Sequence, residues 1–449
     1  MVTTRRRKSA AETLALYMNG ERVGTWRTHS GAEELIYEPA WMQSPRGRPI
    51  SLRFPFVPGE ARYSGAEVHN YFENLLPETQ AIRERLAQRF QTGSIEAFPL
   101  LRELGRDCVG ALQILPEDDP PPAVETLAFT PIDEPAIAEL LRNAALPASG
   151  IARADLDNFR ISIAGAQEKS ALLWHDKRWN IPHGPTPTTH IFKLPLGLIA
   201  NGQVNMSTSV ENEWLCAKVM AAFDVAIAEC EMAQFEDQRV LIVKRFDRQP
   251  SQDGTWIVRL PQEDFCQATG TSYYDKYQNS NGPGIDTILE LLRNSSNATA
   301  DRRAFLKCQL IFWMLAATDG HAKNFSIRIE PGGAYSLTPF YDVLSAWPYM
   351  VGKGAKLSKK KVKLAMAVRS KNAHYQIDEI QRRHWNEMAR RCGLGLNAEN
   401  LIKELIEKTL GVIKRVSEIL PKDFPEHIST PVFEGLQNSS NRLAAMEAS

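Results

Sequence analysis

The sequence lacks a net charge, closely spaced cysteines and long apolar runs, and each absence excludes a class of protein. Its 449 residues include 53 basic and 53 acidic ones, so any contact with nucleic acid must come from a local patch. The six cysteines show no zinc or redox spacing, which favours free, buried thiols in a reducing compartment. The most apolar run, residues 310–317, is far shorter than the ~20 residues of a membrane-spanning helix. No apolar signal-peptide region follows the basic start. We therefore expect a cytoplasmic protein with no membrane partner.

What is present is the composition of a globular protein, with 43 % hydrophobic and 24 % charged residues. Asn19-Gly20 lies between two strand-like runs and predicts a β-hairpin, because Asn-Gly suits the φ > 0 positions of a tight turn. A strand is predicted within residues 48–55, and helices at 66–76 and 78–90. The proline-rich stretch 115–123 predicts a linker after a first module.

Strand patterns dominate the middle of the chain, and helical patterns follow. Strands are predicted at 159–163, 170–174, 190–193 and 240–246, with one helix at 209–222, and later helices at 285–294, 301–317, 378–392 and 398–420. This order predicts an α+β fold with two lobes around a cleft. The expected division is a basic disordered tail at 1–11, an N-terminal subdomain at 12–115, a linker and helix at 116–158, the rest of an α/β N-terminal lobe at 159–246, a helical C-terminal lobe at 247–433 and a polar tail at 434–449.

A polar loop after an apolar helix carries the most informative spacing. In Asp319-Gly320-His321-Ala322-Lys323-Asn324, an Asp precedes an Asn by five positions. Protein kinases use this spacing in their catalytic loop, where the Asp accepts the proton of the attacking hydroxyl and the Asn holds a metal ion. A turn that begins at Asp319 is the structural alternative. For His321 we favour a role in orienting the loop over that of a structural histidine.

A second carboxylate, Asp342, follows the short apolar run 339–341, which we predict as a strand. Kinases place their second metal ligand in such a position. Asn324 and Asp342 suit Mg²⁺, because this ion binds oxygen ligands and accompanies ATP phosphates. ATP and Mg²⁺ are therefore the predicted cofactors, and a helix cap at Asp342 is the alternative.

Upstream stretches supply candidates for nucleotide binding. Small residues let a loop's backbone N–H groups approach phosphates, and the predicted loop consists of Ala164, Gly165, Ala166, Gln167, Glu168 and Lys169. Lys193 ends a predicted strand, where a buried lysine needs a partner; either Glu211 or Glu213 supplies one. An ordinary hairpin loop and a solvent-facing lysine are the alternatives.

The apolar strand 240–246 runs into a charged stretch, as a hinge between two lobes does. We expect Val243, Arg245 and Phe246 to contact the adenine, through the backbone or against the ring. A core strand with a polar end is the alternative reading.

Several long motifs together resemble the HipA family of serine/threonine kinase toxins, over nearly the whole chain. They are the runs 159–169, 259–264, 318–325 and 337–342, with 73–77 and 105–110 in the first module and 363–366 near the end. The resemblance implies a bilobal protein-kinase-like fold. It also implies a small HipB-like helix-turn-helix antitoxin, operator DNA bound through that complex, and protein substrates of the translation machinery, aminoacyl-tRNA synthetases among them. Growth arrest and persistence are the implied outcome.

The resemblance also assigns roles to single residues. Asp319 is the implied catalytic aspartate, Asn324 and Asp342 the Mg²⁺ ligands, Lys193 the phosphate-binding lysine, and Ser162 a site of inactivating autophosphorylation. A phosphate on Ser162 would add roughly −1.5 to −2 charges to a loop that holds ATP phosphates.

A basic segment departs from the family pattern. Lys359, Lys360 and Lys361, with Arg390 and Arg391, are expected either to contact DNA, since such cations release counterions on binding, or to form a solvated face.

Two other functions compete with a protein kinase. The order Asp-x-His-x-x-Asn also resembles phosphoinositide kinases, although it differs from the His-Gly-Asp of aminoglycoside phosphotransferases. A catalytically inactive corepressor is the second, and the intact set Lys193, Asp319, Asn324 and Asp342 argues against it.

Overall fold

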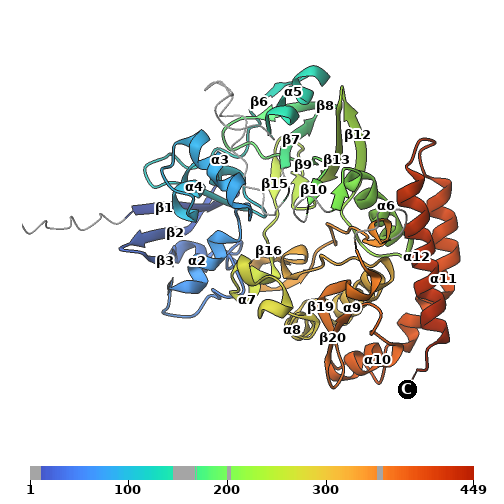
Figure 1. Ribbon diagram of the computed structural model, residues 1–449. Coiled ribbons are helices and arrows are strands. Elements are labelled where there is room, and N and C mark those ends of the chain that lie inside the picture. Colours follow the sequence, from blue (N-terminus) through green and yellow to red (C-terminus); the bar gives the residue numbers. More distant parts are fainter. Residues whose placement is uncertain (1–11, 145–166, 168, 200–203, 351–356, 449) are drawn as a thin grey trace, which may run out of the picture.

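The first unit of the fold is an antiparallel sheet covered by short helices. A computed structural model describes residues 12–144, 167, 169–199, 204–350 and 357–448, and Figure 1 shows this unit in blue. The sheet has the order β4-β3-β2-β1-β5. Its elements are β1 (Glu12–Met18), β2 (Glu21–His29), β3 (Ala32–Tyr37), α1 (Pro39–Gln43), β4 (Arg62–Ser64), α2 (Ala66–Glu73), α3 (Gln80–Phe90), α4 (Ala97–Leu104) and β5 (Leu112–Pro116).

The predicted hairpin is confirmed, and the predicted strand at 48–55 is wrong. Asn19 and Gly20 both adopt positive φ between β1 and β2. In residues 48–55, side chains take the backbone hydrogen bonds that a strand would use. The hydroxyl of Tyr37 accepts from the N–H of Ile50 at 2.9 Å, and the hydroxyl of Tyr71 donates to its carbonyl at 3.1 Å. Ile50 is therefore buried as a loop residue in the core of this unit.

The second unit is a six-stranded sheet with the order β12-β13-β9-β7-β8-β6. Its elements are β6 (Phe129–Pro131), α5 (Glu134–Ala144), β7 (Lys169–His175), β8 (Arg178–Pro182), β9 (His190–Lys193), β10 (Gly197–Ile199), β11 (Val204–Met206), α6 (Ser209–Ala222), β12 (Cys230–Phe235) and β13 (Gln238–Lys244). The predicted strands at 170–174, 190–193 and 240–246 and the helix at 209–222 are confirmed, while 159–163 lies outside the described residues. Strand β6 is the edge strand of this sheet, and helix α5 packs against the sheet. Residues 129–144 therefore belong to this lobe rather than to a linker.

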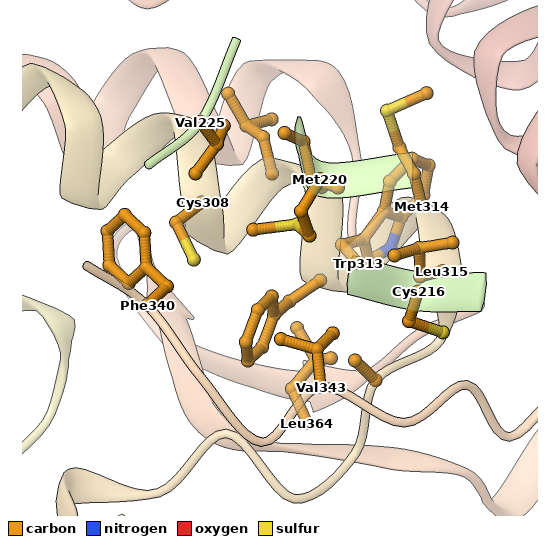
Figure 2. Packing of buried hydrophobic residues seen from close by; sticks show 14 of the residues in the cluster. Cys216, Met220, Val225, Cys308, Trp313, Met314, Leu315, Phe340, Val343 and Leu364 are labelled. Carbon is orange, nitrogen blue, oxygen red and sulfur yellow. The ribbon is translucent and has the colours of Figure 1, made fainter. Parts of the chain in front are cut away.

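The third unit is mainly helical, and its buried apolar residues form one cluster with those of α6 and β13 (Figure 2). Its elements are β14 (Arg248–Pro250), β15 (Ile257–Arg259), β16 (Gln262–Asp264), α7 (Phe265–Thr269), α8 (Ile285–Leu291), α9 (Ala298–Leu315), β17 (Ser326–Ile329), β18 (Tyr335–Leu337), β19 (Lys363–Arg369), β20 (Ala373–Gln376), α10 (Arg382–Arg391), α11 (Glu399–Glu418) and α12 (Glu426–Ala445). The four predicted helices correspond to α8–α11. The strand predicted at residues 339–341 is wrong. Of these residues, Phe340 forms an isolated β-bridge to Ile227.

The expected polar tail at 434–449 is wrong, because residues up to Ala445 continue helix α12. Ile428, Val432, Leu436 and Leu443 are buried on one face of this helix. A Cβ atom on Gly435 would lie 2.5 Å from the ring of Trp347. Small residues therefore form part of the buried face of α12. In the sequence, a helix rich in small residues looks like a polar tail.

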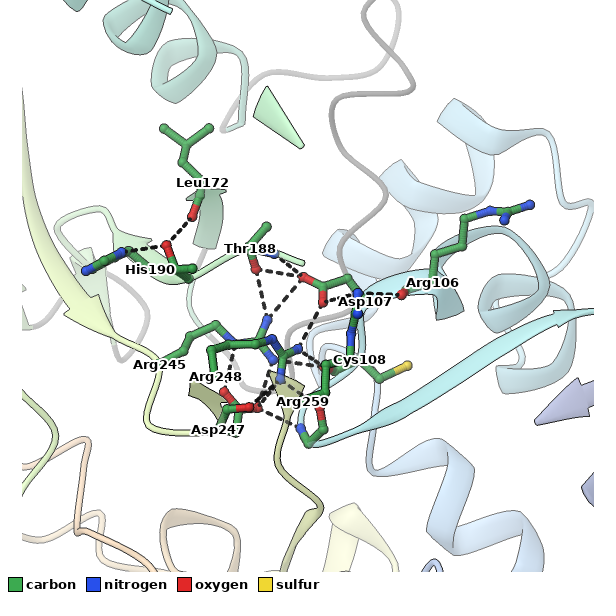
Figure 3. A network of polar contacts seen from close by, with 12 residues as sticks. Arg106, Asp107, Cys108, Leu172, Thr188, His190, Arg245, Asp247, Arg248 and Arg259 are labelled. Carbon is green, nitrogen blue, oxygen red and sulfur yellow. Dashed lines mark hydrogen bonds and ion pairs between the residues drawn. The ribbon is translucent and has the colours of Figure 1, made fainter. Parts of the chain in front are cut away.

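A buried polar network joins the first unit to the other two (Figure 3). Asp107 accepts hydrogen bonds from Arg248 at 2.9 Å and from Arg245 at 3.2 Å. Asp247 pairs with both arginines and accepts from the backbone N–H of Gly110 at 2.7 Å. These arginines hold the pKa of the Asp107 carboxyl well below its usual range despite its burial. Because an unpaired charge here would be costly, the network fixes the orientation of the first unit.

In the described part of the chain, no helix combines the length and the apolar character that crossing a membrane requires.

Candidate active site

A cleft lies where the three units meet. One part of its wall is apolar and suits a flat ring; it comprises Val109, Ile191, Ala217, Ile227, Val243, Phe246 and Val343. The polar part brings together charged residues and one amide from distant segments of the chain: Glu78, Lys169, Lys193, Glu213, Lys323, Asn324 and Asp342. An apolar pocket with a few convergent charges is a typical small-molecule site.

Lys193 is the central cation of this cleft. It ends β9, and its Nζ atom lies 2.5 Å from Glu213 Oε1 and 2.8 Å from Asp342 Oδ1. Lys193 and Glu213 are buried and Asp342 is partly exposed. Burial acts to lower the pKa of Lys193, yet the two carboxylates keep it above its ordinary value. Lys193 in turn holds the pKa of Asp342 well below its usual range. Lys193 and Asp342 are therefore charged at neutral pH.

Helix α6 carries both candidate partners of Lys193, Glu211 and Glu213, and its orientation decides which of them forms the ion pair. Glu213 faces the cleft, and Glu211 is instead bonded to Arg239 of β13. Helix residues two positions apart point in different directions, so only one of them can reach Lys193.

Asp342 stands in an unusual backbone conformation. Its φ is +63°, in the left-handed region that non-glycine residues rarely adopt. Such backbone conformations gather at functional sites, where the surroundings hold them in place. Here the ion pair with Lys193 and the bridge of Phe340 to Ile227 fix the neighbouring chain.

The loop that carries Asp319 begins where helix α9 ends. Ala316 closes the helix with φ +50°, and the loop then folds on itself. The backbone carbonyl of Asp319 accepts from the N–H of His321 at 2.8 Å and from Asn324 Nδ2 at 2.7 Å. The spacing of five residues thus closes a compact turn, while Asn324 lines the cleft.

Asp319 is not among the residues that line the cleft, and its carboxylate is 59 % exposed. Tyr277 donates a hydrogen bond to its Oδ1 atom. Partial desolvation raises the pKa of Asp319 to about 6, although the bond from Tyr277 acts in the opposite direction. A carboxylate with this pKa is ionised at neutral pH and can accept a proton.

His321 is buried beside this carboxylate. Its Nε2 atom lies 3.8 Å from Asp319 Oδ1, and its ring packs edge-to-face on Tyr277 with centroids 5.0 Å apart. Burial lowers the pKa of His321 to about 3, so the ring is neutral. The predicted role in orienting the loop stays a prediction.

The predicted phosphate loop falls mostly outside the described residues. Ser162, Ala164, Gly165, Ala166 and Glu168 are among those not described.

Its last part is described and borders the cleft. Gln167 donates to the carbonyl of Leu194. Lys169 lies opposite Lys193 in the pairing of β7 with β9, and burial together with this second cation lowers its pKa to about 8. Two lysines therefore face one cleft.

The predicted hinge residues line the cleft in different ways. Val243 and Phe246 belong to its apolar wall, and the Phe246 ring lies 5.8 Å from that of Tyr341. The guanidinium of Arg245 is bonded to Asp107 and Asp247 and is only 2 % exposed. Arg245 therefore has a structural side chain, which leaves only its backbone for a nucleotide contact.

The residues present fit a magnesium ion that is shared with phosphates. No cluster of three or more His, Cys, Asp or Glu side chains that could hold a metal occurs among the described residues. Asn324 and the ionised Asp342 nevertheless line the same cleft. Because Mg²⁺ is usually held by one or two protein oxygens, phosphates and water, two such ligands suit this ion when ATP is present.

The predicted basic residues form two separate groups. Lys360 and Lys361 are exposed just before β19, whereas Arg391 donates to the carbonyl of Ser370 after that strand. Arg390 is paired with Glu387. The side chain of Lys359 lies outside the described set, and the DNA contact of these residues stays a prediction.

Sequence reasoning missed three residues that border the site. Asn74 and Glu78 line the cleft from the first unit, and Tyr277 contacts Asp319. Asn74 belongs to the run 73–77, which indicates the family but assigns no role to its residues. Tyr277 has no motif in the sequence, because its contact with Asp319 depends on the tertiary fold.

A sheet-rich lobe and a helical lobe, with a Lys–Glu pair, a loop carrying Asp and Asn, and a second Asp around one cleft, define a protein-kinase-like fold. Residues 14–115 match the family model of the HipA N-terminal domain, and residues 161–414 match that of the HipA-like C-terminal domain. The chain belongs to the HipA family.

Individual relatives agree with this assignment. The chain is 32 % identical to a Sinorhizobium fredii protein named "Putative kinase Y4mE", over 90 % of this chain and 92 % of that protein. It is 25 % identical to the serine/threonine-protein kinase toxin HipA of Shewanella oneidensis, over 76 % and 77 % of the two chains. A chain from the structure of the Shewanella oneidensis HipA, HipB and operator DNA complex matches with a TM-score of 0.76 at 22 % identity, covering 96 % of this chain and 97 % of that one. This last match supports the fold.

Proposed function

We propose that the protein is a serine/threonine protein kinase that transfers the γ-phosphoryl group of ATP to a protein hydroxyl. The observation that carries the proposal is the position of Lys193 between Glu213 and Asp342 in the cleft. In kinases an equivalent lysine contacts the ATP phosphates and is held by a glutamate, while the aspartate binds metal. Family membership and relatives named as kinases support the same activity.

In this proposal each residue has a defined task. Val243 and Phe246 lie against the adenine, and Lys169 and Lys193 bind phosphate oxygens. Asn324 and Asp342 hold Mg²⁺, which when bound neutralises charge on the phosphates. These tasks use the residues that line the cleft.

Asp319 takes the proton in the transfer step. The hydroxyl oxygen of the substrate forms a bond to the γ-phosphorus as the bond from that phosphorus to the β,γ-bridging oxygen breaks, and ADP leaves. The proton of the hydroxyl passes to the carboxylate of Asp319. Because Oδ1 accepts from Tyr277, Oδ2 is the oxygen left for this proton.

We further propose the biological setting of a toxin. The partner is a HipB-like helix-turn-helix antitoxin, with operator DNA bound through the complex; the support is that a chain from such a complex is among the structural neighbours of this chain. Lys360, Lys361, Arg390 and Arg391 are candidates for DNA contacts. The substrate is a component of the translation machinery, with aminoacyl-tRNA synthetases as the first to test. Phosphorylation of it would arrest growth, and phosphorylation of Ser162 would inactivate the kinase.

Mass spectrometry of the purified protein after incubation with Mg²⁺-ATP tests the proposal. We expect one phosphate on Ser162 in the wild type, and none in Asp319→Ala or in Ser162→Ala. A phosphate that persists in Asp319→Ala would remove the role of Asp319, and one that persists in Ser162→Ala would place the modification elsewhere. If the wild type neither gains a phosphate nor transfers one to a panel of aminoacyl-tRNA synthetases, a corepressor without catalysis becomes the better reading.

A further inference from the structure

The first unit reaches into the loop that carries Asp319 and Asn324. Lys323, which directly precedes Asn324, is almost completely buried, with a side chain 3 % exposed. Its Nζ atom donates to the backbone carbonyl of Asn74 and to Asn74 Oδ1, each at 2.9 Å. A third bond, also 2.9 Å long, goes to Asp264 Oδ2.

These three bonds use every donor of the lysine. An ammonium group has three N–H bonds, and two of the three acceptors here belong to a residue 249 positions away in the sequence. The third acceptor is a carboxylate, that of Asp264, so the ammonium also has a counter-charge. Lys323 is therefore an anchor of the loop, although a lysine beside a nucleotide cleft is usually expected to bind phosphate.

Asn74 is itself rigidly held. It is 1 % exposed, and its Nδ2 atom donates to the carbonyl of Thr271 at 2.9 Å and to that of Asn70 at 2.8 Å. The amide thus connects helix α2, the segment after α7 and the loop through one side chain. A group fixed on both sides can hold a partner within a narrow range of positions.

A second bridge from the same unit holds the other side of the loop. Glu78 pairs with Lys276 at 2.5 Å, and the carbonyl of Lys276 accepts from the N–H of Ala322 at 3.3 Å. The next residue, Tyr277, bonds to the Asp319 carboxylate. Both ends of the loop therefore depend on residues of the first unit.

We infer that Asn74 is a positioning residue of the phosphoryl-transfer site, which through Lys323 fixes the loop that carries Asp319 and Asn324. The first unit is then a part of the catalytic apparatus as well as an attached module. The inference rests on the proposed kinase function for its catalytic consequence, but the anchoring of the loop is independent of it.

Three variants at Asn74 and Asn70, at the C-terminal end of α2, test this inference. Asn74→Ala removes the Oδ1 acceptor of Lys323 and leaves the backbone carbonyl in place. Asn70→Ala is the matched control, because Asn70 Nδ2 donates to the carbonyl of Gly270 at 2.9 Å, across the same interface and one helical turn away, without touching the loop. Asn74→Asp keeps an acceptor for Lys323 but loses the Nδ2 donor to the carbonyls of Thr271 and Asn70, so it separates the two halves of the amide.

Hydrogen–deuterium exchange of peptides that cover 319–325 gives a readout free of catalysis. The N–H groups of His321, Ala322 and Asn324 are bonded within or beside this loop. We expect their exchange to be at least about threefold faster in Asn74→Ala than in Asn70→Ala, and slower in Asn74→Asp than in Asn74→Ala. Equal exchange in Asn74→Ala and Asn70→Ala would overturn the anchoring, whether or not the protein is a kinase.

The kinetic readout concerns phosphate transfer from Mg²⁺-ATP. A displaced catalytic group costs on the order of 10- to 100-fold in rate, so we expect kcat to fall by about this factor in Asn74→Ala while KM for ATP changes less than about threefold. Asn74→Asp should recover part of kcat, and Asn70→Ala should stay near wild type. A loss of kcat in Asn70→Ala as large as that in Asn74→Ala would overturn the positioning role. An inactive wild type with a loosened loop in Asn74→Ala would instead contradict the proposed function alone.

Discussion

The Nζ atom of Lys193 lies 2.8 Å from Oδ1 of Asp342, although 149 positions separate the two residues in the sequence. The pair connects the sheet-rich lobe with the helical lobe at the centre of the cleft. Glu213 completes a triad in which two carboxylates share one cation. The triad is the strongest sign that the two lobes act together on a phosphorylated ligand, because a lysine bound to ATP phosphates must be held without being neutralised.

Replacement of Lys193 should weaken nucleotide binding. Lys193→Met removes the cation that faces the phosphates and leaves two carboxylates without their partner, so we expect the Kd for Mg²⁺-ATP to rise at least about tenfold, which is about 1.4 kcal/mol. Isothermal titration with a nonhydrolysable ATP analogue measures this. Lys177→Met, at an exposed turn between β7 and β8, is the control. An unchanged Kd in Lys193→Met would remove the lysine from the phosphate site.

Asp342 should determine how strongly ATP binding depends on magnesium. In the wild type we expect Mg²⁺ to tighten ATP binding, because Asn324 and the ionised Asp342 share the ion with the phosphates. Asp342→Asn keeps the size of the side chain and removes its charge, so most of this gain should be lost. Titrations of ATP with Mg²⁺ and with EDTA measure the difference. The same magnesium gain in the mutant would place the ion elsewhere.

Asp319 should control both the rate of transfer and its pH dependence. The pKa of about 6 predicts that kcat falls as the pH drops below about 6, since a protonated carboxyl cannot accept the hydroxyl proton. Asp319→Asn should lower kcat by about 10²- to 10⁴-fold, the usual contribution of a general base, and leave the Kd for ATP nearly unchanged. Asp275→Asn, an exposed aspartate nearby, is the control. A kcat that stays constant between pH 5 and pH 8 would contradict the role of Asp319 as the base.

Local patterns in the sequence predicted the elements well, because their causes are local. The Asn19-Gly20 turn and helix α6 each follow from a few neighbouring residues. Two residues of the cleft lining, Asn324 and Asp342, could also be named from the sequence, because they occur in motifs. The selection of Glu213 over Glu211 could not be predicted, since it depends on which face of α6 the tertiary fold turns toward Lys193.

Tertiary contacts explain the elements that sequence patterns predicted wrongly. The alternating residues 48–55 form a loop because hydroxyls of Tyr37 and Tyr71 replace the neighbouring strand. Contacts of Asn74 with Lys323 join segments far apart in the chain, and no local pattern records them.

Glu263 should make stability depend on pH. It is fully buried on β16, where its Oε1 accepts from the N–H of Leu52 at 2.8 Å, and burial raises its pKa to about 8. Between the unfolded value near 4.5 and about 8, the unfolded carboxyl loses its proton while the folded one keeps it. The free energy of unfolding should therefore fall as pH rises through this range, by at most about 1.4 kcal/mol per pH unit.

Urea unfolding of Glu263→Gln at pH 5, 6, 7 and 8 measures this effect. The amide resembles the protonated carboxyl, so the part of the pH slope that Glu263 causes should disappear. The free energy of unfolding of the variant should therefore rise relative to that of the wild type as pH rises. Glu231→Gln, at an exposed position of β12, should keep the slope of the wild type. Parallel pH slopes for Glu263→Gln and wild type would show that the carboxyl titrates near its ordinary value.

Two helical glycines should respond in opposite ways to alanine. Gly435 of α12 packs on Trp347, and a Cβ atom there would lie 2.5 Å from ring atoms. Gly411 of α11 would place its Cβ 3.3 Å from the flexible end of Arg415. Since alanine in a helix interior is favoured over glycine by about 1 kcal/mol, Gly411→Ala should raise the free energy of unfolding by roughly 0.5–1 kcal/mol. Gly435→Ala should lower it by about 1–3 kcal/mol, because overpacking in a core forces its neighbours to move. Urea unfolding of both variants measures the difference, and a stabilised Gly435→Ala would mean that α12 does not pack on Trp347 in solution.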